Sequence, residues 1–128
     1  MKRRLSALTL SLTFTACSGP DSDLPEAYRR LEVPEALLRS PEARASGRKL
    51  FLANCATCHL GQGGLIGQAG PPDLLNGPLP RGDSEAALTA WTANGTGSPA
   101  MPAFAGGLSP AEIAEVVRYI REERALKR

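Results

Sequence analysis

Two thiols and an imidazole stand close together in the middle of this chain, in the run Cys55-Ala56-Thr57-Cys58-His59. This spacing is typical of a site to which a haem is attached covalently. Each thiol can add across one vinyl group of the porphyrin and form a thioether, and the neighbouring imidazole is then held under the iron as its proximal ligand. The pattern therefore predicts one covalent haem, attached through Cys55 and Cys58 and ligated by His59.

Other uses of a cysteine pair fit the chain less well. A zinc site needs four ligands, usually as two separated pairs, but the chain has one histidine and its third cysteine, Cys17, is far away near the N-terminus. A redox-active dithiol is expected near a strand–helix–strand pattern, which this sequence lacks. A structural disulfide between Cys55 and Cys58, or a pair of buried thiols, leaves His59 without a role. Haem attachment is the hypothesis that uses all three residues.

The composition also indicates a sixth iron ligand. The chain contains two methionines, one of which is the initiator. The other, Met101, lies in the run Gly97-Ser98-Pro99-Ala100-Met101-Pro102-Ala103-Phe104, where the flanking prolines should stiffen the loop. A loop methionine can simply fill a gap, but no other side chain competes for this position. We therefore expect Met101 to ligate the iron opposite His59.

Length and composition fit one small domain built around a ligand. The chain has 128 residues, of which 5% are aromatic, with 13 glycines and 11 prolines. A domain of this size is marginal alone, so a covalently held macrocycle would supply apolar core. The formal net charge of +2 becomes −1 if residues 1–16 are removed, because Lys2, Arg3 and Arg4 leave and no acidic residue does. We expect no nucleic-acid binding, which would require a basic face.

The N-terminus resembles a bacterial lipoprotein signal. Basic residues at positions 2–4 precede an uncharged apolar stretch over residues 5–16, which is too short to span a bilayer. Small residues come directly before Cys17, as in the motif whose cysteine is acylated after cleavage. We expect residues 1–16 to be a signal peptide and Cys17 to be lipidated. The protein would then be extracytoplasmic and anchored to a bacterial membrane, on the periplasmic side in a Gram-negative host.

Two long helices are expected to frame the haem run. Ser40 followed by proline is a typical helix start, and the apolar spacing predicts a helix over residues 41–53, from whose C-terminal end the cysteines emerge. Ser109 followed by proline and then Glu112 predicts a capping box at the start of a helix over residues 110–125. An apolar stripe runs along that last helix, so one of its faces should be buried.

The remaining segments are expected to be shorter or irregular. A short helix should begin after Asp83 or Ser84 and end near Ala93. Residues 61–80 are rich in glycine and proline, and a loop of that length is expected to have a function such as wrapping a haem edge. Residues 17–40 are expected to form a lipid-anchored tether or an N-terminal arm. No convincing strand or repeat is present.

The order of these motifs resembles that of the class I cytochromes c. It comprises the haem run preceded by Gly47, the segment Gly70-Pro71-Pro72-Asp73-Leu74, Trp91, the run Met101-Pro102-Ala103-Phe104 and a last helix that would cross the first near its glycine. The resemblance covers residues 41–128. It implies a small all-α cytochrome c fold, with three to four helices wrapped around one covalently bound haem c.

The resemblance also implies further roles around the haem. The carbonyl of Pro72 would accept a hydrogen bond from Nδ1–H of His59, which fixes the ring and raises its basicity as a ligand. Leu74 would pack on the haem face, and Trp91 near a haem edge. Arg81 is either a solvated loop arginine or the partner of a haem propionate.

These ligands imply an electron carrier rather than an enzyme. A haem with histidine and methionine both bound has no open site, and methionine ligation raises its reduction potential. We expect the protein to shuttle single electrons between respiratory or other extracytoplasmic redox proteins. Two alternatives remain: a fixed electron-entry subunit of a larger complex, and a haem enzyme or gas-binding domain with a labile methionine.

Overall fold

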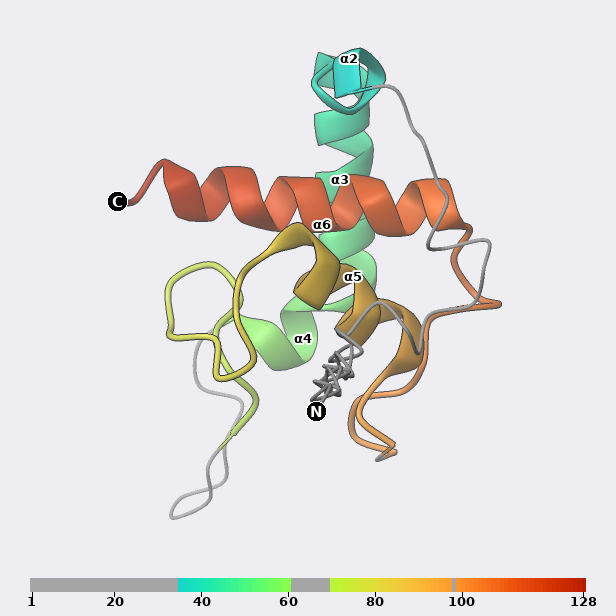
Figure 1. Cartoon of the computed structure of the whole chain (residues 1–128), viewed down its shortest axis with the longest axis vertical. Helices are drawn as coiled ribbons and strands as arrows, with labels where there is room; N and C mark the ends of the chain where they lie inside the picture. The colour runs from blue at the N-terminus through green and yellow to red at the C-terminus, as the bar shows by residue number, and fades with distance from the viewer. Residues whose placement is uncertain (1–34, 61–69, 98) are drawn as a thin grey trace, which may run out of the picture.

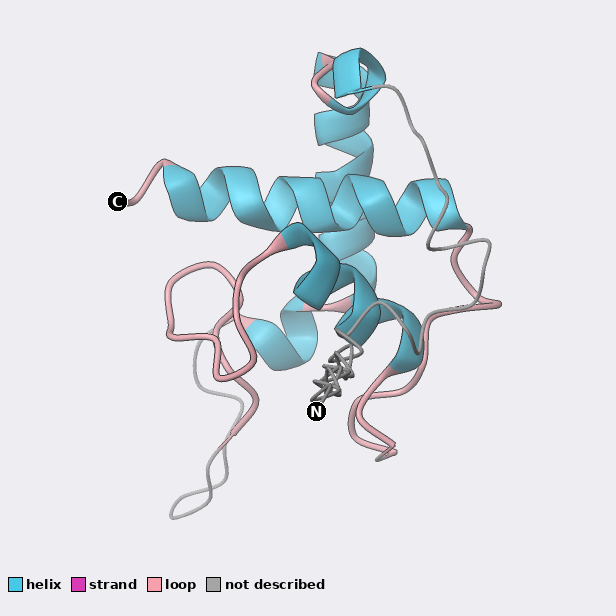
Figure 2. Ribbon diagram, viewed as in Figure 1, coloured by secondary structure: helices cyan, strands magenta, loops and turns pink. Residues whose placement is uncertain are grey.

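The structure is a computed structural model that describes residues 35–60, 70–97 and 99–128. Within these ranges the chain forms helices and no strand (Figures 1 and 2). The helices are α2 (Glu35–Leu38), α3 (Pro41–Asn54), α4 (Ala56–His59), α5 (Glu85–Asn94) and α6 (Pro110–Ala125). The predicted all-α class is confirmed, and the two four-residue helices α2 and α4 accompany the three longer ones that were expected.

Both long helices begin where the sequence predicts, because their caps are local. The Ser40 hydroxyl accepts a hydrogen bond from the Ala43 N–H at 3.1 Å. At the start of α6 the Ser109 hydroxyl accepts from the Glu112 N–H at 3.3 Å, and the Glu112 carboxylate accepts from the Ser109 N–H at 2.8 Å. That backbone hydrogen bond lowers the pKa of Glu112 below its usual value. A cap of this kind typically contributes about 0.5–2 kcal/mol.

The shorter helix α5 is capped by Ser84 rather than by Asp83. The Ser84 hydroxyl accepts from the Ala87 N–H at 3.1 Å. The helix ends at Asn94, and Gly95 follows with φ of 65°. Its buried residues are small or aliphatic, and α5 packs against α6 (Figure 1). They are Ala87, Leu88, Ala90 and Ala93.

The helices α3 and α6 cross closely at Gly47, as predicted (Figure 1). A Cβ atom built on Gly47 would lie 2.3 Å from the Glu115 carbonyl oxygen and 3.0 Å from the Tyr119 Cβ. One turn later Phe51 is fully buried, with its ring centroid 5.5 Å from that of Tyr119. The absence of a side chain at Gly47 therefore permits the backbones to approach.

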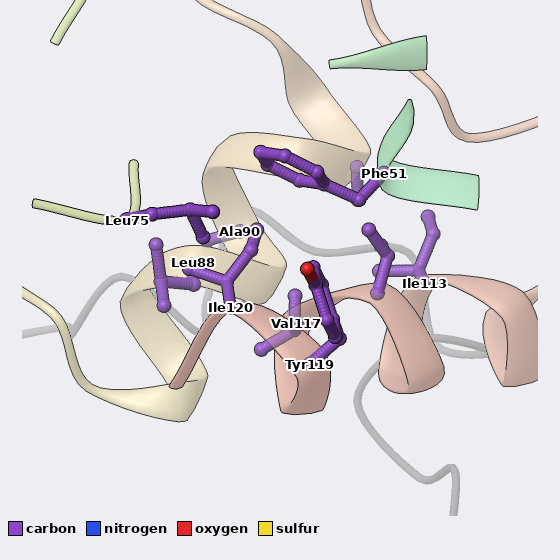
Figure 3. Close-up of a cluster of buried hydrophobic side chains, with 10 residues drawn as sticks. Phe51, Leu75, Leu88, Ala90, Ile113, Val117, Tyr119 and Ile120 are labelled. Atoms are coloured by element: carbon purple, nitrogen blue, oxygen red, sulfur yellow. The ribbon is translucent and has the colours of Figure 1, made fainter. Parts of the chain in front are cut away.

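A hydrophobic cluster joins the three longer helices to the loop before α5. In Figure 3, Phe51 and Ile113 lie near Tyr119, while Leu75 and Leu88 gather around Ile120. The apolar stripe predicted for α6 is thus buried. The cluster consists of Phe51, Leu75, Leu88, Ala90, Ala93, Ile113, Val116, Val117, Tyr119 and Ile120.

The expected N-terminal arm is described only over its last residues. There α2 contacts α3 and α6, and Leu38 is buried. The expected signal peptide, Cys17 and the rest of the arm lie outside the described residues, as does the loop over 61–69. No helix in the described ranges has the length and hydropathy needed to cross a membrane.

Replacing Gly47 with leucine is expected to destabilise the fold. The new side chain would meet the backbone of α6, which cannot move without disturbing the cluster. The free energy of unfolding should therefore fall by about 1–3 kcal/mol. Chemical denaturation followed by circular dichroism measures this change. The matched control is Ala45→Leu at an exposed position of α3, which should change stability by less than about 0.5 kcal/mol. Equal stability of the two variants would contradict the close crossing.

Candidate haem-binding site

A cavity of about 570 Å³ lies beside the haem run. This volume is in the range of about 300–1,000 Å³ that is usual for small-molecule and cofactor sites. Its walls come from α4, the loop over residues 70–82, α5, the loop carrying Met101, and α6. The lining residues are mostly apolar: Thr57, Cys58, His59, Gly70, Pro71, Pro72, Leu74, Leu79, Pro80, Arg81, Gly82, Leu88, Trp91, Thr92, Thr96, Ala100, Met101 and Ile120.

The imidazole of His59 is buried at the cavity wall with one nitrogen already engaged. Its Nδ1 lies 2.9 Å from the carbonyl oxygen of Pro72, so the predicted contact is confirmed. A carbonyl oxygen can only accept a hydrogen bond, so Nδ1 carries the hydrogen and donates it. In the neutral ring Nε2 then keeps its lone pair and is available to a metal. The contact fixes both the tautomer and the orientation of His59.

One turn of helix holds the two cysteines next to this histidine. The Cys55 carbonyl accepts hydrogen bonds from the N–H groups of Cys58 at 3.2 Å and His59 at 2.9 Å. Cys58 lines the cavity, whereas Cys55 is half-buried against the hydrophobic cluster, and the two thiols are not joined in a disulfide. Burial raises the pKa of the Cys55 thiol from 9.0 to about 11. This is the opposite of the lowered pKa that a redox-active dithiol requires.

The segment that follows Pro72 is a tight turn that is hydrogen-bonded to the backbone of His59. The Leu74 N–H donates to the His59 carbonyl at 3.1 Å, and the Leu74 side chain lines the cavity. One carboxylate oxygen of Asp73 accepts from the N–H groups of Leu75 at 2.9 Å and Asn76 at 3.0 Å. The hydrogen bond from the Asn76 side chain, supported by these two backbone donors, lowers the pKa of Asp73. His59 is therefore held through both its ring and its backbone.

The loop that carries Met101 is tied to the end of α5. The Thr96 N–H donates to the Met101 carbonyl at 3.2 Å, and the N–H groups of residues 104–105 donate to carbonyls of α5. Gly95 makes this approach possible, because a Cβ built on it would lie only 2.6 Å from the Met101 carbonyl oxygen. Met101 is half-buried and lines the same cavity as His59.

An arginine and a tryptophan form one wall of the cavity. The Arg81 guanidinium carbon lies 3.6 Å from the centroid of the Trp91 ring. This is well inside the distance of about 6 Å over which a cation is attracted to an aromatic face. Arg81 is exposed to solvent, yet the contact holds it at the cavity rather than leaving it a free loop side chain. Among the described residues that line the cavity, it carries the one permanent charge.

The cavity brings together most of the residues predicted for the site. Those that line it are Cys58, His59, Pro72, Leu74, Trp91 and Met101. Cys55 is adjacent through α4, and Cys17 lies outside the described residues. The sequence did not identify the contributions of Gly95 and Asp73, although each has a local signal. Glycine after the end of a helix indicates positive φ, and aspartate in a loop indicates a turn closed by its own carboxylate.

The chain is similar in sequence to one family model and to several known proteins. A family model described as cytochrome c oxidase, cbb3-type, subunit III matches residues 42–120. The chain is 41% identical over 81 residues to cytochrome c6 of Leptolyngbya boryana, and the matched stretch covers 62% of this chain and 91% of that protein. It is 39% identical over 75 residues to cytochrome c6 of Anabaena variabilis, covering 59% and 85%. No solved structure matches the chain significantly.

Proposed function

This chain belongs to the class I, monohaem cytochromes c, and from that premise we propose how it holds its haem and where it works. Members of this family carry one covalent haem c, and the chain is a one-electron carrier. We assign the thioethers to Cys55 and Cys58. The assignment of the axial ligands rests on one observation: His59 and Met101 line the same cavity.

The two axial ligands belong to segments that are held in place independently. His59 is fixed by the Pro72 carbonyl and by the Leu74 N–H. Met101 is fixed by backbone hydrogen bonds to the end of α5 and its flanking turn. When bound, the haem supplies an iron centre that gains and loses one electron. Because both ligands are positioned by the fold, we expect little rearrangement to accompany that exchange.

The rest of the cavity suits a flat apolar ligand that carries acidic groups. Leu74 and Trp91 present apolar surface to the cavity, against which a haem can pack. Arg81, held on the Trp91 ring, is the cation available to the carboxylates of a haem. These residues therefore supply packing and charge rather than chemistry, and we propose that the protein is not an enzyme.

Redox spectroscopy of the purified protein tests this function. We expect covalent haem that survives acid acetone, a titration that fits a single one-electron step, and a reduced spectrum that carbon monoxide does not change. Resistance to carbon monoxide follows because methionine occupies the sixth position. Full binding of carbon monoxide by the wild-type protein would instead favour the gas-binding alternative.

A second candidate is a fixed subunit that admits electrons to a larger complex. The description of the matching family model, a subunit of a cbb3-type oxidase, favours this possibility. Mild extraction followed by size-exclusion chromatography distinguishes the two. A carrier elutes at the size of the single chain and is reduced and oxidised in solution, whereas a fixed subunit elutes with its complex.

We further propose that the carrier works outside the cytoplasm, tethered by lipid on Cys17. The basic start, the short apolar stretch and the small residues before this cysteine support the assignment. Acyl chains contribute about 0.8 kcal/mol per buried methylene group, so two chains anchor a small domain stably.

Cys17→Ser should therefore release the protein from the membrane fraction or leave it unprocessed. Its haem spectrum should equal that of the wild type, because position 17 precedes residues 41–128, the part of the sequence expected to hold the haem. Fractionation and mass spectrometry of the mature N-terminus measure the outcome. An unmodified Cys17 in the mature wild-type protein would refute the anchor.

A further inference from the structure

Two basic side chains, one at the end of α6 and one just after it, hydrogen-bond to the turn over residues 73–77, which follows Pro72. Nη1 of Arg124 donates to the carbonyl oxygens of Leu74 and Gly77, both at 3.0 Å. Nζ of Lys127 donates to the side-chain oxygen of Asn76 at 2.6 Å. In Figure 1 the yellow-green loop lies next to this end of α6. These contacts join segments about fifty residues apart in the sequence, so they depend on the tertiary fold.

The position of Arg124 is not explained by the helix alone. A basic residue in the last turn of a helix interacts favourably with the helix dipole even when fully exposed. Arg124 instead turns inward and is half-buried, and its Nε is buried without a hydrogen-bond partner in the part of the chain that the structure describes. Burying an unpaired N–H group costs free energy. The hydrogen bonds to the Leu74 and Gly77 carbonyls offset that cost and connect the Arg124 side chain to the turn.

The turn that Arg124 holds is rigid and connected to the iron ligand. The Gly77 N–H donates to the Asp73 carbonyl at 3.0 Å, which closes the turn. Immediately before it, the Pro72 carbonyl accepts from the His59 ring, and within it the Leu74 N–H bonds the His59 backbone. A displacement of the turn would therefore change both contacts that orient His59.

We propose that Arg124 is a positioning residue for the proximal ligand. By holding the Leu74 and Gly77 carbonyls it fixes the segment 72–77, and through that segment it sets the hydrogen bond on the His59 ring. This inference rests on the proposed function, because ring orientation and ligand basicity influence a reduction potential only when His59 ligates the iron. The potential of the carrier should consequently depend on a residue that lines no part of the haem cavity.

Two charge-conserving variants test the proposal. Arg124→Lys keeps the positive charge but replaces a planar group that reaches two carbonyls with a single ammonium. The matched control is Arg121→Lys, one turn earlier, where the arginine pairs with the accessible carboxylate of Glu85 at 2.8 Å. Both variants keep the net charge, so a difference in their reduction potentials or exchange rates reflects the loss of the Arg124 hydrogen bonds to the turn.

Arg124→Lys should weaken the hydrogen bond to the His59 ring. A less basic imidazole stabilises the oxidised iron less, so the reduction potential should rise above the wild-type value. Hydrogen exchange of the His59 Nδ1–H and of the Leu74 amide, measured by NMR, should become at least about tenfold faster, which corresponds to about 1.4 kcal/mol. Arg121→Lys should match the wild type in both measurements.

Several results would overturn the proposal. Equal potentials and exchange rates in the two variants would show that Arg124 does not position the ligand. Faster exchange throughout α3 and α5 would show that it only stabilises the whole fold. If Arg124→Lys fails to retain haem, Arg124→Gln serves as the second variant, because its shorter amide side chain cannot hold both carbonyls. Loss of a positive charge alone would lower the potential, so a rise supports the proposal and an equal or lower potential refutes it. Failure of the proposed function is distinguishable, because the wild type itself would then lack covalent haem or the sulfur–iron absorption band.

Discussion

Cys55→Ala combined with Cys58→Ala is expected to give a chain that neither retains haem covalently nor reaches the native fold. Without the ligand, the walls of a cavity of about 570 Å³ would face each other across empty or wet space. Apolar walls that face an unfilled or wet space lose packing, and deleting even one large buried side chain typically costs about 2–5 kcal/mol. Typical domains have only about 5–15 kcal/mol of stability in total. The haem is therefore a large part of the core.

Haem staining after acid acetone extraction and far-ultraviolet circular dichroism measure the two effects. The matched control is Thr57→Ala, which lies between the cysteines, is exposed and lines the same cavity. It should keep both the covalent haem and the helical spectrum. Haem that is extracted from the wild type, or retained after extraction by the double variant, would contradict attachment through these thiols.

The helix boundaries could be predicted because the signals that set them are local. Ser40 and Ser109 cap helices through hydrogen bonds to residues three positions along the chain, so a short stretch of sequence contains the whole interaction. The choice between Asp83 and Ser84 could not be made in this way. Both can cap a helix, and only the geometry of the preceding loop decides that Ser84 does so.

The proximal side of the site was predictable to a similar degree. The haem run is contained in one turn of helix, and the family resemblance supplied the partner of His59, thirteen residues later, at Pro72. What the sequence could not supply are the contacts between distant side chains. The stacking of Arg81 on Trp91 depends on how the loop before α5 folds back. The reach of Arg124 depends on the angle at which α6 crosses the rest of the domain.

Met101→Ala is the second change with a large expected effect. It removes the sulfur assigned to the sixth position, and no other side chain of that loop can replace it. The ferric protein should lose the weak near-infrared band of a sulfur–iron bond completely. Its reduction potential should fall, because methionine ligation raises the potential, and the iron should become open to cyanide. Optical spectra and a redox titration measure these changes, and an unchanged spectrum would refute the assignment of Met101.

Gly95→Ala should produce the same spectral loss while Met101 is still present. The backbone of Gly95 has φ of 65° and ψ of −159°, a region that is strained by about 1–3 kcal/mol for other residues. In addition, the new methyl group would meet the Met101 carbonyl oxygen at 2.6 Å and the Ala103 nitrogen at 2.7 Å, so the methionine loop must move away from α5. The matched control is Gly97→Ala, at which φ is also positive, 72°, but nothing lies within 4 Å of the added carbon. If the loop position determines ligation, Gly95→Ala loses the near-infrared band and Gly97→Ala keeps it, whereas retention of the band in both variants would show that Gly95 does not place the ligand.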